Sequence, residues 1–79
     1  MAKVRFFAAA AEAAGTSSET VAADTLGALR EALAELHGDA FARVLGRCSI
    51  LVDGTHIDSP AAPLADGSLV DVLPPFAGG

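Results

Sequence analysis

Several residue types that specialised proteins depend on are scarce in this chain of 79 residues. It has one cysteine, Cys48, so no internal disulfide can form, and a reducing, cytoplasmic setting is expected. Five Lys and Arg stand against ten Asp and Glu, which argues against the clustered basic surface that nucleic acid requires. No apolar run approaches the roughly 20 residues of a membrane span. The N-terminus shows no signal-peptide pattern, so no membrane partner is expected.

Large aromatic residues are also rare, since the chain has no Trp or Tyr and four Phe. A chain of this length predicts one domain with one modest core. The net charge of −5 favours a protein partner with a basic groove. His37 and His56 lie on separate predicted elements with no ligand cluster at metal spacing, so we expect both to face solvent and no zinc site to form. No catalytic triad or phosphate-binding glycine loop is present, which argues against an autonomous enzyme.

The first residues alternate in the manner of a strand over Lys3–Ala8. The inner face would carry Val4, Phe6 and Ala8, and the outer face Lys3, Arg5 and Phe7. An alanine-rich helical turn over Ala9–Ala14 is stopped by Gly15. A second strand is predicted over Glu19–Ala23.

The main helix is predicted over Leu26–His37, with Thr25 or Asp24 capping its start and Gly38 ending it. Its leucines form one stripe, and its charged residues are expected to face water. The stripe is Leu26, Leu29, Leu33 and Leu36, and the water-facing residues are Arg30, Glu31 and Glu35. A short second helix is predicted over Asp39–Leu45, ending at Gly46.

The second half of the chain predicts three more strands. Alternation over Arg47–Asp53 places Cys48, Ile50 and Val52 inward, and Asp53-Gly54 is typical of a two-residue hairpin turn. That turn would pair Val52 with Thr55, Leu51 with His56, and Ile50 with Ile57. The last strand, Leu69–Leu73, turns Val70 and Val72 inward. A helix over one face of a small sheet gives an α+β arrangement, in which neighbouring first and last strands would bring Lys3 and Arg5 near Asp71.

The end of the sequence, Pro74–Gly79, predicts an extended arm. Pro74 and Pro75 fix their own φ angles and keep the preceding residues extended. Gly78 and Gly79 lack a Cβ and can enter a slot too narrow for other residues. We therefore expect a domain over residues 1–73 and a tail over residues 74–79 that delivers the terminal carboxylate of Gly79 to another protein.

A small docking patch is predicted beside the root of this arm. Alternation turns Phe7 outward next to Leu73, with Leu51 a possible third member and His56 at its edge. Exposed apolar residues that gather in this way mark an interaction surface. Cys48 shares the inward parity of Ile50 and is expected to be a buried, inert thiol rather than a sulfur relay.

These features together resemble the ubiquitin-like sulfur carriers, most closely those that form the small subunit of molybdopterin synthase. The segments that carry the resemblance are VRFFA at 4–8, the capped helix after Asp24-Thr25, the Asp53-Gly54 hairpin, PLADG at 63–67 and LPPFAGG at 73–79. The resemblance implies a β-grasp fold, in which a mixed sheet wraps the main helix and the first and last strands run parallel at its centre. It also implies a flexible Gly-Gly tail.

The resemblance further implies the chemistry of the tail. An activating enzyme would use ATP to adenylate Gly79, and a sulfur donor protein would convert it to a thiocarboxylate. The large synthase subunit, in a heterotetramer, would then guide that sulfur onto the pterin precursor. The carrier itself would bind no cofactor. Gly79 would carry the sulfur, and the partner-binding residues would be Phe7, Leu51, Leu73, Pro74, Pro75, Phe76, Ala77 and Gly78.

Two departures and three alternatives accompany this hypothesis. Ala10-Ala11-Glu12 stands where the family often has Leu-Arg-Glu, and Phe76 where a smaller aliphatic residue is common. The same tail would suit sulfur delivery to cysteine, thiamin or tRNA. It would also suit a ubiquitin-like modifier that forms isopeptide bonds with lysines. A plain binding module with an incidental tail is the fourth reading.

Overall fold

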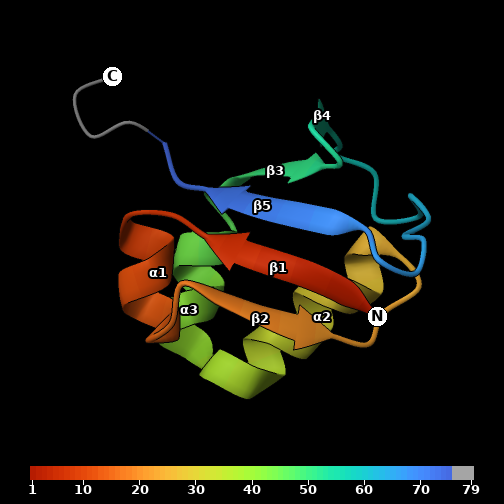
Figure 1. The fold of residues 1–79 in the computed structure, drawn as a ribbon. Helices are drawn as coiled ribbons and strands as arrows, with labels where there is room; N and C mark the ends of the chain where they lie inside the picture. The colour runs from red at the N-terminus through yellow and green to blue at the C-terminus, as the bar shows by residue number, and fades with distance from the viewer. Residues whose placement is uncertain (76–79) are drawn as a thin grey trace.

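One five-stranded mixed sheet, in the order β2-β1-β5-β3-β4, carries three helices on one of its faces (Figure 1). The computed structural model describes residues 1–75, so the predicted arm residues Phe76–Gly79 lie outside the described residues. The elements are β1 Ala2–Phe6, α1 Ala9–Ala14, β2 Ser18–Val21, α2 Leu26–His37, α3 Asp39–Leu45, β3 Ser49–Val52, β4 Thr55–His56 and β5 Leu69–Leu73. Within residues 1–75, no helix has the length and apolarity needed to cross a membrane.

The centre of the sheet is the parallel pair β1 and β5, as the resemblance implied. Lys3 lies opposite Leu69, Arg5 opposite Asp71 and Phe6 opposite Val72. β2 pairs antiparallel with β1, and β3 pairs antiparallel with β5. The ends of the described chain therefore contribute its central strands, which confirms the predicted β-grasp arrangement.

The core lies between the sheet and α2, where the predicted alternation and the leucine stripe meet. Val4, Phe6, Val70 and Val72 are buried on the inner face of the sheet, and Val52 is half-buried. The helices cover them with Leu26, Leu29, Leu33, Phe41 and Leu45. Burial of these aliphatic side chains supplies most of the free energy that stabilises the domain.

The start of α2 is held by both a side chain and a distant loop. The Thr25 hydroxyl accepts a hydrogen bond from the Ala28 N–H at 3.1 Å, as predicted for a helix cap. The N–H groups of Leu26 and Gly27 donate to carbonyls of the loop after β4, those of Ala62 and Pro60. A Cβ on Gly27 would lie 3.1 Å from Pro60, so this close approach requires glycine or a small shift of the loop.

The predicted hairpin is confirmed at its turn and in its register. Asp53 and Gly54 both have positive φ, 49° and 85°, as a type I′ turn requires. Leu51 pairs with His56 and Val52 with Thr55. The N–H of Ile57 also donates to the carbonyl of Ile50 at 3.0 Å, so the third predicted pair is bonded as well.

Two predictions for the last turn of α2 were wrong: Leu36 was expected on the buried stripe and His37 in solvent. Leu36 is 63% exposed, whereas the His37 side chain is only 13% exposed. Eleven residues are about three helical turns, so His37 falls on the line of Leu26, and Leu36 lies to one side of it. The His37 ring packs against Phe6 and Phe41, with centroids 5.8 and 4.9 Å away, and its Nε2 bonds Glu19 of β2.

Three smaller predictions also differ from the structure. Ala8 is exposed rather than inward, because β1 ends at Phe6 and the Ala8 backbone turns at φ 49° into α1. Arg30 is half-buried rather than water-facing, with one guanidinium nitrogen buried and unpartnered among residues 1–75. β3 begins only at Ser49, because Arg47 lies in the turn after α3.

We predict that His37→Ala destabilises the fold far more than Leu36→Ala, its neighbour on the same helical turn. Loss of His37 removes aromatic packing and leaves a half-buried Glu19 without its partner, which costs about 1–3 kcal/mol. Loss of the exposed Leu36 costs at most about 0.5 kcal/mol. Urea unfolding of the two variants measures the difference, and equal losses would contradict the packing described here.

Candidate functional site

The site forms where β5 ends and the chain leaves the sheet. Leu73 is the last paired residue, opposite Ser49 of β3. Pro74 and Pro75 follow without backbone N–H groups, so neither can donate to the sheet and the ladder stops there. Figure 1 shows that this end of β5 lies at the same end of the molecule as α1.

An apolar hollow of about 620 Å³ lies at this point, and we call it the arm-root hollow. Its lining is apolar except for one serine. The lining residues are Phe7, Ala8, Ala9, Ser49, Leu73, Pro74 and Pro75. Four of the predicted partner-binding residues therefore meet in one place, and Phe7 is 38% exposed there.

Phe7 is held in this position by the backbone on both sides of it. Its N–H donates to the carbonyl of Val72 at 3.2 Å, and its own carbonyl accepts from the Ala10 N–H at 3.0 Å. The guanidinium of Arg5 lies over the ring, 5.6 Å from its centroid. The turn at Ala8 thus leaves Phe7 on the uncovered face of the sheet, as predicted.

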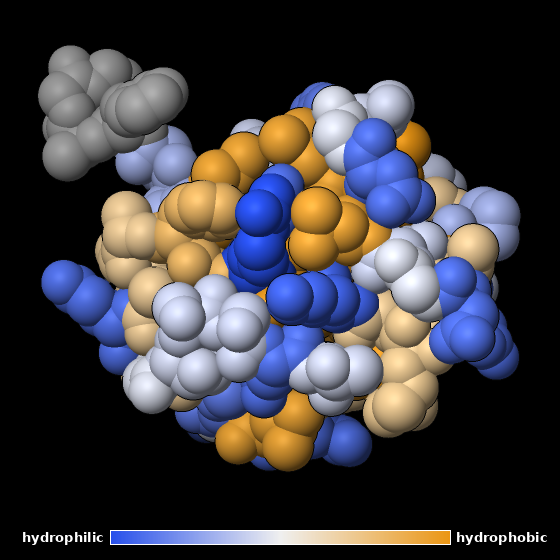
Figure 2. All heavy atoms as spheres, in the orientation of Figure 1, coloured by the Kyte–Doolittle hydropathy of each residue, from blue (hydrophilic) through white to orange (hydrophobic). Residues whose placement is uncertain are grey.

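A charged pair at the middle of this face separates the predicted patch into two parts. Arg5 donates Nε to Oδ1 and Nη2 to Oδ2 of Asp71, at 2.7 and 2.9 Å, in a bidentate pair. The hydrogen bond to Asp71 raises the pKa of Arg5. Leu51 lies opposite Asp71 and is half-buried, and it does not line the arm-root hollow. Figure 2 shows hydrophilic surface at the middle of this face with hydrophobic surface on either side.

His56, the predicted edge residue, lies beyond Leu51 on β4. It is exposed, and its Nε2 is 3.1 Å from the Asp58 carboxylate. It is not among the residues that line the arm-root hollow.

A second hollow, of about 370 Å³, flanks the other side of Pro74 and Pro75. It is lined also by Ala9, Val44, Arg43 and Arg47. These two arginines were not predicted from the sequence. Arg43 lies on the predicted helix and Arg47 was assigned to the following strand, so no spacing rule within one element linked the two.

Cys48 lies near this site but its environment is that of a structural thiol. It is half-buried against the core, and its Sγ donates to the Val44 carbonyl at 3.1 Å. Burial raises the pKa of the Cys48 thiol, so it stays protonated and weakly nucleophilic. Among residues 1–75, no group of three or more His, Cys, Asp or Glu is placed to hold a metal ion.

Comparison with known proteins agrees with this fold. The chain matches the model of the ThiS family over residues 4–79. Comparison with proteins of curated function gave no match.

The solved structures that cover nearly the whole chain include the following three. A chain from the complex of subunits 1 and 2 of the molybdopterin-converting factor of Helicobacter pylori is 32% identical, with a TM-score of 0.76, over 99% of this chain and 97% of that one. SAMP1 of Haloferax volcanii is 27% identical, with a TM-score of 0.77, over 99% and 98%. A putative molybdopterin-converting factor subunit 1 of Pyrococcus furiosus is 26% identical, with a TM-score of 0.84, over 95% and 97%.

A mixed sheet with parallel central strands, one main helix and two prolines directly after the last strand define a ubiquitin-like sulfur carrier. Within that class, the chain belongs to the ThiS family.

We predict that Cys48 reacts slowly with iodoacetamide in the folded protein. A raised pKa lowers the thiolate fraction at a given pH, and half-burial limits access, so alkylation at pH 8 should be roughly tenfold or more slower than in the urea-unfolded chain. Mass spectrometry of timed samples measures both rates. Equal alkylation rates in the folded and unfolded chain would show that the thiol is exposed, and a role for Cys48 as a sulfur relay would then have to be considered.

Proposed function

We propose that this chain carries sulfur for molybdopterin synthesis, as a thiocarboxylate on Gly79. The observation that carries the proposal is the arm-root hollow, where Phe7, Leu73 and Pro74 present an apolar surface continuous with the arm. The likeness to molybdopterin-converting factor subunit 1 of two organisms supports this acceptor.

The chemistry begins from a carboxylate that cannot accept sulfur directly. A terminal carboxylate has a pKa of about 3.5 and is a stable anion at neutral pH. In the proposed sequence, an activating enzyme joins the carboxylate oxygen to the α-phosphorus of ATP, and pyrophosphate leaves. The terminal sulfur of a donor persulfide then attacks the carbonyl carbon, and AMP leaves with the C–O electron pair. A thiol reduces the resulting acyl disulfide, which releases the thiocarboxylate.

The residues of this chain position that group and leave catalysis to partners. Gly79 carries the sulfur, and Gly78 gives the backbone clearance in a narrow channel. Leu73 through Ala77 would lie along the partner's channel, with Pro74 and Pro75 keeping the start of the arm extended. Among residues 1–75, those that line the arm-root hollow include no side chain suited to general acid or base catalysis.

The proposed partners are the large subunit of molybdopterin synthase, the activating enzyme and the sulfur donor. The Helicobacter pylori structure is a complex of subunits 1 and 2 of its molybdopterin-converting factor, and we extend that pairing to this chain. Apolar surface at the arm root is the part of the site that such a subunit would cover.

Intact-protein mass spectrometry tests the proposal directly. After co-expression with an activating enzyme and a sulfur donor from the same organism, we expect a species in which one oxygen is exchanged for sulfur. Fragmentation should place the exchange at Gly79, and a variant lacking Gly79 is the control. Repeated absence of that species would contradict sulfur carriage.

A second candidate is a protein modifier, favoured by the likeness to SAMP1 of Haloferax volcanii, a small archaeal modifier protein. The same activated glycine could form isopeptide bonds with lysine amines. Higher-mass adducts in cells that disappear on deleting Gly79 would support this function.

We predict that Phe7→Ala weakens binding to the large synthase subunit by about tenfold or more. An exposed aromatic residue at the centre of an interface commonly contributes at least about 1.4 kcal/mol. Phe7→Leu should retain most of the affinity. Leu36→Ala removes an exposed hydrophobic residue on a different element and serves as the control.

Isothermal titration calorimetry measures these affinities, and melting temperatures confirm that each variant folds. An affinity of Phe7→Ala equal to that of Leu36→Ala would show that the arm-root hollow is not the contact.

A further inference from the structure

The few positively charged side chains of this acidic chain are unevenly distributed over its surface. Among residues 1–75, Arg5 is paired with Asp71 and Arg30 is half-buried. The exposed cationic side chains without an ion pair in that part of the chain are Lys3, Arg43 and Arg47. Two of these three flank the arm, in the hollow that Pro74 and Pro75 also line.

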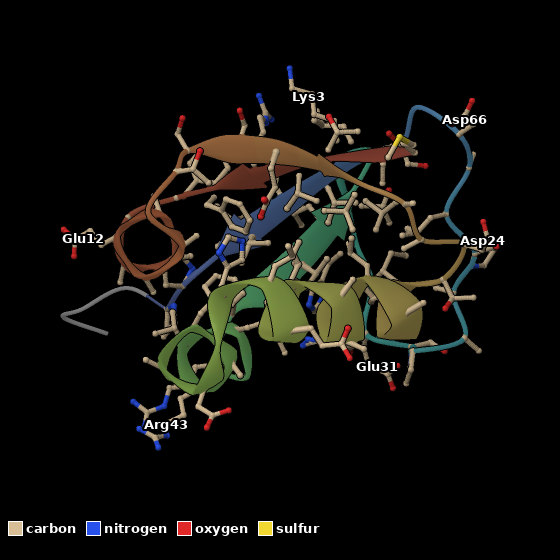
Figure 3. The ribbon with its side chains drawn as sticks, turned by 90° about the horizontal axis from the view of Figure 1, so that it is seen from below. Lys3, Glu12, Asp24, Glu31, Arg43 and Asp66 are labelled. Carbon is tan, nitrogen blue, oxygen red and sulfur yellow. The ribbon has the colours of Figure 1, made fainter. Side chains whose placement is uncertain are left out.

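Arg43 and Arg47 lie so close to Pro74 and Pro75 that a protein bound to these prolines would also contact the two arginines. Pro74, Pro75 and Ala9 line both the apolar arm-root hollow and the hollow with Arg43 and Arg47. A protein that encloses the prolyl start of the arm must therefore lie against both sides of it. Figure 3 shows Arg43 projecting from α3, on the opposite side of the molecule from Lys3.

Covering an arginine without a partner is costly, and neither Arg43 nor Arg47 forms an ion pair within residues 1–75. Asp39, one turn before Arg43 on α3, is not in an ion pair with it among the described residues. A guanidinium that loses water needs oxygen acceptors, and carboxylates fit its planar donors in bidentate fashion. Arginine is accordingly enriched where interfaces bind carboxylates.

We propose that Arg43 and Arg47 form an acid-binding surface, and that the protein receiving the arm places carboxylate side chains against it. This inference rests on the proposed function only in that a partner encloses the arm. The predicted basic groove of the partner, expected from the net charge of −5, then belongs to surfaces away from the arm root. At the arm root the partner's surface should instead be apolar on one side of the prolines and acidic on the other.

Charge reversal with a matched control tests this surface. Arg43→Glu and Arg47→Glu each change the net charge by the same amount as Lys3→Glu, which alters an exposed cation far from the arm. Exposed ion pairs contribute modestly one by one, but a reversal also sets like charges against each other, so each arginine reversal should weaken binding roughly tenfold. Lys3→Glu should change the affinity by less than about twofold. Arg43→Lys with Arg47→Lys keeps the charge but loses the planar bidentate donors, so its affinity should fall between that of the wild type and that of either reversal.

Binding is measured by calorimetry against two proteins from the same organism, the large synthase subunit and the activating enzyme, at low and high NaCl. The wild-type affinity should fall with salt, and the arginine reversals should flatten that dependence. Melting temperatures verify that each variant is folded. Affinities of the arginine variants equal to that of Lys3→Glu would overturn the inference.

The two proposals fail differently. If the wild type binds only the activating enzyme, the molybdopterin assignment fails, while the arginine effect on that binding still decides this inference. If the wild type binds the large subunit and the arginine reversals bind equally well, only the acid-binding surface is wrong. Binding to neither protein would overturn both.

Discussion

The parallel pairing of β1 with β5 determines where the site forms. Parallel strands end at the same edge of a sheet, so the residue after β1 and the residue after β5 become neighbours. Phe7 and Pro74 are those residues, and the hydrogen bond from the Phe7 N–H to the Val72 carbonyl joins the two strand ends. The arm therefore leaves the fold beside an exposed aromatic ring for reasons that lie in the sheet.

The Arg5–Asp71 pair protects the register of that pairing. A slip of one residue would turn Asp71 into the core and Val72 outward, and burial of an unpaired carboxylate is strongly unfavourable. In the observed register, Asp71 accepts a bidentate hydrogen bond on the outer face. The pair also holds Arg5 over Phe7, so register and site geometry depend on the same side chains.

The arm divides its surroundings by polarity. On one side lie Phe7 and Leu73, and on the other lie Arg43 and Arg47, with Pro74 and Pro75 between them. A prolyl segment can separate two such surfaces because it forms no further strand pairs and loses little conformational freedom on binding. The arm root is therefore a composite surface, apolar and positive, on an otherwise acidic protein.

Much of the fold could be predicted because local and non-local signals agree. The Asp53-Gly54 turn, the Thr25 cap and the alternation of Val70 and Val72 each have one favoured structure, and each is observed. Phe7 and Leu73 were placed from parity alone and do line one hollow. Residues placed by strand alternation were thus the most predictable part of the site.

The predictions failed for residues whose burial depends on how the helices pack against the rest of the fold. His37 is polar and was assigned to solvent, yet the helical angle places it over Phe6 and Phe41, with Glu19 as its partner. Half-buried Arg30 shares a hollow with Ala42 and Leu45 of α3, and α3 brings Arg43 beside the prolines. No pattern within α3 alone shows which way it crosses α2. Leu51 has the right parity for the patch, but Asp71 stands between it and Phe7.

The central claim is that the adjoining ends of β1 and β5, with the arm between two surfaces, are what a partner binds. An NMR titration of the ¹⁵N-labelled chain with the large synthase subunit tests it most directly. We expect the amide signals of Phe7, Ala8, Ser49 and Leu73 to shift together with those of Arg43 and Arg47. Shifts confined to the edge strands β2 and β4, with the signals around Phe7 and Leu73 unchanged, would contradict the account.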